Sequence, residues 1–93
     1  MSLVTYLLGY QIYFWSNENG EPVHFHIAKG KRGENNTKFW ILSDGSVVLA
    51  KHNGHQPIKD VKKILKALQK DKSIAMQVIE DWKYIFGYVR FIR

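Results

Sequence analysis

Two histidines separated by one residue, His24 and His26, are the side chains whose type and spacing are best suited to chemistry. Alternate side chains of an extended strand point to the same face, so both imidazoles would share one face and Phe25 would lie on the other. Such a pair can place two nitrogens on one metal ion. It can also act as a general acid and a general base, because histidine titrates near neutral pH. The spacing supports both kinds of site and does not decide between them.

A metal site needs at least a third ligand besides His24 and His26. The candidates that folding could bring to the pair are His52, His55, Asp44 and Glu34. The four histidines are thus candidate ligands for a divalent metal, and no other cofactor is expected. The competing interpretation, which we favour, is a pair of half-exposed sheet histidines that hydrogen-bond to neighbours or contact a partner.

The catalytic alternative is a small nuclease or metal-dependent hydrolase in which His24 and His26 carry the reaction. A basic rim beside them would hold a phosphate backbone, and its members are Lys29, Lys31, Arg32 and Lys38. No nucleophile and no ribonuclease motif accompany the pair. The loop at 30–33 lacks the Gly-Lys-Ser/Thr ending of a phosphate-binding loop. The chain is therefore not assigned as an enzyme.

The elements that must position the pair are predicted to be an antiparallel sheet followed by two helices. Runs of aromatic and branched residues between turn clusters predict strands at 10–15, 23–29, 37–42 and 46–51. Because the loops are short, neighbouring strands should be antiparallel, which gives a four-stranded meander over about 10–51. Apolar residues at helical spacing predict helices at about 57–70 and 73–86, and 88–92 would add a short strand. The prediction is one α+β domain over 1–93 with both helices on one sheet face.

The charge of the chain favours an acidic partner. The net charge is +6 and the isoelectric point is near 9.7. Lysines recur along one stripe of the first predicted helix. The candidate residues for nucleic acid or another anionic partner are Lys31, Arg32, Lys59, Lys63, Lys66 and Lys70. The competing interpretation of the stripe is the solvated face of a helix packed on the core.

Composition and apolar runs limit the classes of protein further. Cysteine is absent, which excludes a disulfide scaffold, a cysteine-ligated zinc finger and a cysteine nucleophile. No run approaches the roughly 20 apolar residues of a membrane span, and the first residues lack the features of a signal peptide, so a cytoplasmic protein is expected. Aromatic side chains on the sheet face away from the helices would need a cover. We therefore expect a partner protein or a homodimer.

The motif Pro22-Val23-His24-Phe25-His26, on a strand that follows a short hairpin turn, resembles an uncharacterised bacterial family, domain of unknown function 4160. The resemblance spans roughly residues 9–86 and includes the turn at 43–45, the helix that opens near Pro57, and Trp82. Members of the family commonly have a second proline at position 23, where this chain has valine.

The resemblance implies a small intracellular bacterial protein. Such proteins are often encoded beside another small domain, in pairs that look like toxin–antitoxin modules. The implied role is a binding or regulatory component of such a pair that contacts a partner protein, with nucleic acid as a further partner. It does not indicate whether this chain would be the toxin or the antitoxin.

Overall fold

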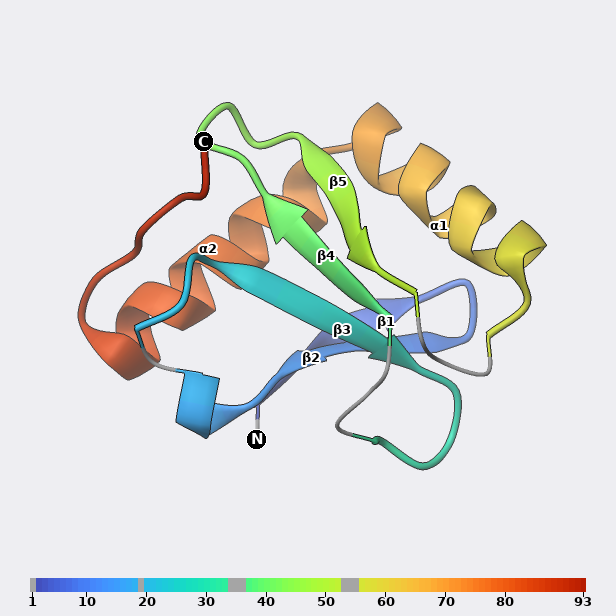
Figure 1. Cartoon of the computed structure of the whole chain (residues 1–93), viewed down its shortest axis with the longest axis horizontal. Helices are drawn as coiled ribbons and strands as arrows, with labels where there is room; N and C mark the ends of the chain where they lie inside the picture. The colour runs from blue at the N-terminus through green and yellow to red at the C-terminus, as the bar shows by residue number, and fades with distance from the viewer. Residues whose placement is uncertain (1, 19, 34–36, 53–55) are drawn as a thin grey trace.

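The computed structural model describes residues 2–18, 20–33, 37–52 and 56–93. In chain order the elements are β1 (Ser2–Leu7), β2 (Tyr10–Phe14), the 3₁₀ helix η1 (Ser16–Glu18), β3 (His24–Ala28), β4 (Lys38–Ile41), β5 (Val47–Lys51), α1 (Ile58–Lys70) and α2 (Ser73–Phe86). Figure 1 shows the two helices on one side of the sheet. No helix in the described part of the chain is long and apolar enough to cross a membrane.

The sheet has five strands in the order β1-β2-β3-β4-β5, and every neighbouring pair is antiparallel. The predicted α+β meander followed by two helices is confirmed, but the prediction of four strands is wrong because β1 precedes them. The hairpin that the prediction missed joins β1 to β2 through a turn at Leu8 and Gly9, whose φ angles are 52° and 83°. Two positive φ values suit a tight hairpin, and leucine is not a residue that marks such a turn.

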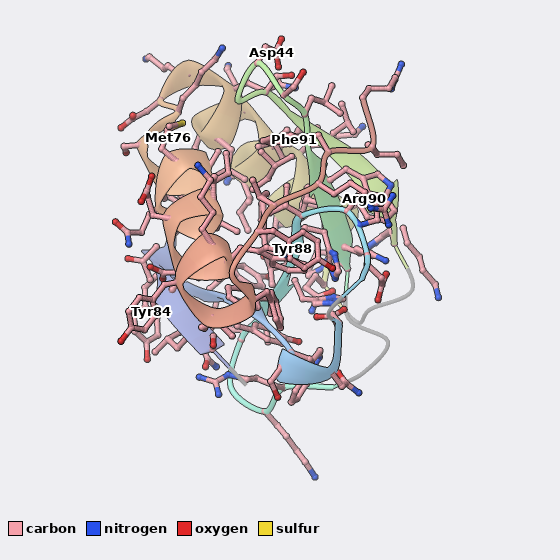
Figure 2. All side chains as sticks on the ribbon, turned by 90° about the vertical axis from the view of Figure 1, so that its left-hand side faces the viewer. Asp44, Met76, Tyr84, Tyr88, Arg90 and Phe91 are labelled. Carbon is pink, nitrogen blue, oxygen red and sulfur yellow. The ribbon has the colours of Figure 1, made fainter. Side chains whose placement is uncertain are left out.

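The short strand predicted at 88–92 is an extended tail instead. The backbone N–H of Val23 donates to the carbonyl of Arg90 at 2.7 Å, and that of Ser43 donates to the carbonyl of Arg93 at 2.9 Å. These two bonds join the tail to the ends of two neighbouring strand segments, so it does not extend the ladder. Figure 1 shows the tail, in red, running past the end of the sheet, and Figure 2 shows Tyr88, Arg90 and Phe91 along it.

The core lies between the sheet and the helices. Alternate residues of the central strands supply its large side chains, which include Phe14, Phe25 and Phe39, all fully buried. The helical stripes supply the other half: Val61, Ile64, Leu68, Ala75, Val78, Ile79 and Trp82. Because strand side chains alternate, burying Phe25 against the helices places His24 and His26 on the opposite face.

The opposite face is covered over its middle by the chain's own loops. Tyr13 is fully buried there, with the ring of Trp15 edge-on at 5.6 Å and the guanidinium of Arg32 at 5.5 Å. The Tyr13 hydroxyl donates to the carbonyl of Gly33 at 3.1 Å. The aromatic centre of this face therefore does not require a partner to bury it.

Candidate functional site

The strand register confirms the predicted placement of the histidine pair. His24 lies opposite Trp40, and His26 lies opposite Lys38 on one side and Tyr13 on the other. Directly paired residues of antiparallel strands point to the same face. The two imidazole centroids are 5.3 Å apart.

Both imidazoles are buried, so the expectation of half-exposed histidines is wrong. His24 is 0% exposed and His26 is 4% exposed. The rings of Trp40 and Trp82 pack against His24 with centroids 5.5 and 5.2 Å away. Trp82 belongs to α2 on the helix side, and it reaches His24 because His24 is the first residue of β3, at the end of the strand. The polar pair is thus enclosed, and a buried polar group needs hydrogen-bond partners.

The main partner is Glu18, a residue that the sequence analysis missed. Its Oε2 lies 2.5 Å from Nε2 of His24 and 3.0 Å from Nε2 of His26. Glu18 ends η1, and its Oε1 accepts the backbone N–H of Trp15 at 2.7 Å. One feature of the sequence could have indicated Glu18: it is an acidic residue in the loop just before the histidine strand. A turn in that loop that folds back on the sheet can place its carboxylate beside the histidines.

The orientation of His24 is fixed from both sides. Its Nδ1 lies 2.8 Å from the carbonyl of Pro22, which can only accept, so Nδ1 carries a hydrogen and donates. The ring then presents Nε2 to Glu18. The three atoms that could bind a metal ion, one each from Glu18, His24 and His26, lie within 4.8 Å of one another. We call these three residues the Glu-His-His cluster.

Electrostatics favour the ionised form of Glu18. Burial desolvates this carboxylate and by itself would raise the pKa. The hydrogen bonds from His24, His26 and the Trp15 backbone outweigh that effect and hold the pKa of Glu18 well below its usual range. An anionic oxygen and two imidazole nitrogens thus converge, which suits a transition-metal ion or a structural hydrogen-bond network.

The other predicted metal ligands lie outside this cluster or outside the described residues. The Nδ1 of His52 lies 2.8 Å from the hydroxyl of Thr37, in a separate network with Gln56. Asp44 lies in the turn between β4 and β5, where hydrogen bonds from Ser46 lower the pKa of its carboxyl. His55 and Glu34 fall on residues that the structure does not describe.

The basic rim predicted beside the pair is divided between the two faces of the sheet. Lys29 lies over the ring of Tyr10, which belongs to the core on the helix side. Lys38 forms an ion pair with Glu21 at 3.0 Å and lies over Trp40 at 4.3 Å. Arg32 is partly buried on Tyr13, and Lys31 is exposed. The remaining candidates, Lys59, Lys63, Lys66 and Lys70, are exposed on α1.

An open pocket of about 530 Å³ lies beside the cluster, lined by Trp15, Ser16, Asn17, Glu18 and Glu21. Glu18 is the one cluster residue in this lining. The indole Nε1 of Trp15 is buried and has no hydrogen-bond partner among the described residues. Solvent therefore reaches the carboxylate from the η1 side, while the imidazoles lie behind it.

Comparison with known proteins identifies a family. A family described as "Domain of unknown function (DUF4160)" matches residues 9–83, and this span contains the whole Glu-His-His cluster. Searches of curated proteins and of solved structures found no match. The chain belongs to this family of unknown function, as the histidine motif predicted.

Proposed function

We propose that the chain is the binding or regulatory component of a toxin–antitoxin-like pair and that it binds a partner protein through β1. Leu3 and Tyr6 are exposed on β1, and Leu8 is exposed in the turn that follows it, where it lines a pocket with Tyr10 and Ile64; we call these three residues, Leu3, Tyr6 and Leu8, the β1 edge surface. All three precede residue 9, so the family match contributes nothing to this part of the proposal. The expected cytoplasmic location belongs to the proposal too.

Leu8 is the observation that carries the proposal. Its φ is 52°, and it is the one non-glycine residue with positive φ among those described. An L-residue in this conformation costs about 1–2 kcal/mol. The side chain is also 59% exposed and lines a pocket beside Tyr10 and Ile64, so burial offsets little of the strain. Strain held by an exposed apolar residue supports a role in contacting a partner.

The position of β1 gives the partner a place to bind. β1 forms one edge of the sheet, and none of its six residues is charged. Leu3 and Tyr6 pair with Tyr13 and Gln11, so they point to the face that no helix covers, and they are 40% and 62% exposed. An uncharged edge strand with exposed apolar side chains is a template for adding a partner's strand, although the bulge between Leu3 and Thr5 interrupts part of it.

The nuclease alternative is less well supported by the geometry. A general acid or base must come within hydrogen-bond reach of its substrate. The Nε2 atoms of His24 and His26 both face Glu18, and the side chains are 0% and 5% exposed. The pocket beside them is lined by η1 and its neighbours and by neither imidazole. We therefore propose binding and not hydrolysis.

The test of the proposal is to substitute Leu8→Asn. Asparagine tolerates a positive φ, so the free energy of unfolding should rise by about 0.5–1 kcal/mol. The same change removes an apolar contact and should weaken partner binding at least about tenfold. The matched control is Leu49→Asn on the opposite edge strand, where the leucine is 39% exposed.

The chain should be co-expressed with the products of the genes that flank its own, and complexes should be isolated and titrated by calorimetry. Light scattering of the chain alone measures self-association through the same edge. The proposal predicts that Leu8→Asn stabilises the fold and weakens the complex while Leu49→Asn leaves binding unchanged. Equal binding by wild type and Leu8→Asn, or failure to bind any of these proteins, would contradict it.

Nucleic acid is a second candidate partner, favoured by the exposed lysines of α1. Fluorescence anisotropy with an RNA and a DNA duplex should show affinity that falls steeply as salt rises. The double variant Lys63→Glu/Lys66→Glu should lose this binding, whereas Lys83→Glu, an exposed lysine of α2, should lose little. Absence of binding would exclude this partner, and affinity that is independent of salt or of the α1 charges would contradict binding through α1.

A further inference from the structure

We infer that the Glu-His-His cluster binds one Zn²⁺ ion and that this ion ties η1 to β3. The inference is independent of the proposed partner binding. It assigns a ligand set that the sequence analysis did not contain, because Glu18 takes the third position in place of His52, His55, Asp44 or Glu34.

The donor set fits zinc chemically. Two imidazole nitrogens and one carboxylate oxygen form a mixed set that Zn²⁺ accepts readily in tetrahedral sites. Mg²⁺ and Ca²⁺ prefer all-oxygen sets, so they are disfavoured here. The set is also drawn from two separate elements, since Glu18 ends η1 and the histidines lie on β3. A metal would therefore cross-link a short turn to the centre of the sheet.

Two of the three ligands are already held in the orientation that a metal requires. Metal-binding histidines usually donate their second ring N–H to a carbonyl or carboxylate, which aims the other nitrogen at the ion. His24 does this with the Pro22 carbonyl at 2.8 Å and leaves Nε2 facing the cluster. Glu18 accepts the Trp15 backbone N–H on Oε1, which leaves Oε2 facing the histidines.

The two distances from Glu18 require only a small expansion, and all three ligand atoms already lie within 4.8 Å of one another. Two donors bonded to one tetrahedral Zn²⁺ at about 2.0–2.1 Å lie about 3.3 Å apart. The Glu18 Oε2 atom is 2.5 Å from His24 Nε2 and 3.0 Å from His26 Nε2, as expected when hydrogen bonds replace the ion. Opening both gaps moves Glu18 outward by less than about 1 Å.

The structure also provides room and access for that movement. The Glu18 side chain is 12% exposed and lines the open pocket, whereas the histidines are fixed on the sheet. Zinc can reach the cluster from the pocket, and a water molecule there can complete the fourth position. The site is thus closed on its imidazole side and open on its carboxylate side.

The experiment uses the full chain with any affinity tag removed, first stripped with a chelator. Zinc is then titrated in competition with a chromophoric chelator, and bound Co²⁺ is followed by its visible d–d absorption, which is intense when the ion is tetrahedral. Glu18→Gln and His26→Gln each remove one ligand while keeping side-chain volume close to that of the wild type. His52→Ala is the matched control, because it removes a histidine outside the cluster.

Wild type and His52→Ala should bind one zinc per chain with equal affinity and show tetrahedral Co²⁺ bands. Glu18→Gln and His26→Gln should bind at least about tenfold more weakly and lose those bands. Far-UV circular dichroism checks that each variant is folded. If a variant does not fold, the wild-type stoichiometry and Co²⁺ spectrum against His52→Ala decide the question. Absence of zinc binding by wild type, or wild-type affinity in the folded Glu18→Gln variant, would overturn the inference.

Discussion

Glu18 organises the polar cluster, because its Oε2 is shared by His24 and His26 while its Oε1 is anchored on the backbone of Trp15. The histidine face was predictable, since side chains alternate along any strand and Phe25 had to enter the core. The burial and the third residue were not predictable. They depend on how the loop at 15–22 folds back, and a turn composition does not specify that path.

Replacing His24 with alanine should destabilise the metal-free protein strongly. The change leaves a cavity beside Trp40 and Trp82 and removes a hydrogen-bond partner from the Glu18 carboxylate. We expect the free energy of unfolding, measured with urea in the presence of a chelator, to fall by about 2–4 kcal/mol. His52→Ala loses one hydrogen bond to Thr37 and should lower the free energy of unfolding by about 1 kcal/mol. Equal losses would show that the cluster adds no particular stability.

Tyr10 should make the stability of the protein depend on pH in the alkaline range. Burial, together with the hydrogen bond to Asp60 and the charge of Asp60, raises the pKa of Tyr10 to about 12. In the unfolded chain the Tyr10 hydroxyl loses its proton at about pH 10. Its contribution to the free energy of unfolding is therefore complete below about pH 10 and declines as pH rises from about 10 to 12. In Tyr10→Phe, urea denaturation should show a smaller decline over that range than wild type. Tyr84→Phe, which alters a 91% exposed tyrosine, should follow wild type. A Tyr10→Phe curve that parallels wild type would contradict this assignment.

At the scale of elements, the sequence pattern was enough to predict both helices, from apolar periodicity, and four of the strands, from runs of aromatic and branched residues between turn clusters. It failed for β1 because Leu8-Gly9 carries no turn signal and because the residues at 2–7 lack a strict apolar–polar alternation. The bulge between Leu3 and Thr5 changes which residues share a face, and spacing alone does not reveal a bulge.

The end of α2 depends on a glycine. Gly87 has a φ of 83°, and its backbone N–H donates to the carbonyl of Lys83 at 2.8 Å. A Cβ at this position would meet no atom within 4 Å, so the cost of Gly87→Ala is conformational. We expect that variant to lose about 1–2 kcal/mol of stability in urea denaturation, and Gly87→Asn to lose less, because asparagine tolerates this conformation. Equal stability of the alanine variant and wild type would argue against a left-handed cap.

At the scale of the whole molecule, the tail at 88–93 lies across one end of the sheet and also packs against the core. Val89 and Phe91 pack partly against the core, and the carbonyls of Arg90 and Arg93 accept backbone bonds from Val23 and Ser43. Its backbone path was predicted as a strand, but no neighbouring strand offers it a continuous ladder. An extended apolar segment of this length does not indicate by itself whether it pairs or packs.

Removing residues 88–93 should therefore destabilise the whole protein. Loss of the partly buried side chains and of two backbone hydrogen bonds should lower the free energy of unfolding by about 2–4 kcal/mol. Thermal denaturation and limited proteolysis measure the effect. Tyr84→Ala, on the outer side of α2 in Figure 2, is the control and should change stability by less than about 0.5 kcal/mol. A truncated chain as stable as wild type would show that the tail only rests on the surface.

The central claim is that a partner protein binds along β1, and hydrogen–deuterium exchange tests it most directly. Exchange should be measured for the chain alone and in its isolated complex. The backbone amides of β1 (Ser2–Leu7) should exchange more slowly in the complex, because a partner strand would pair with the free edge, while those of β5 (Val47–Lys51) should be unchanged. Unchanged exchange in β1, with new protection confined to β5 or α1, would contradict the claim.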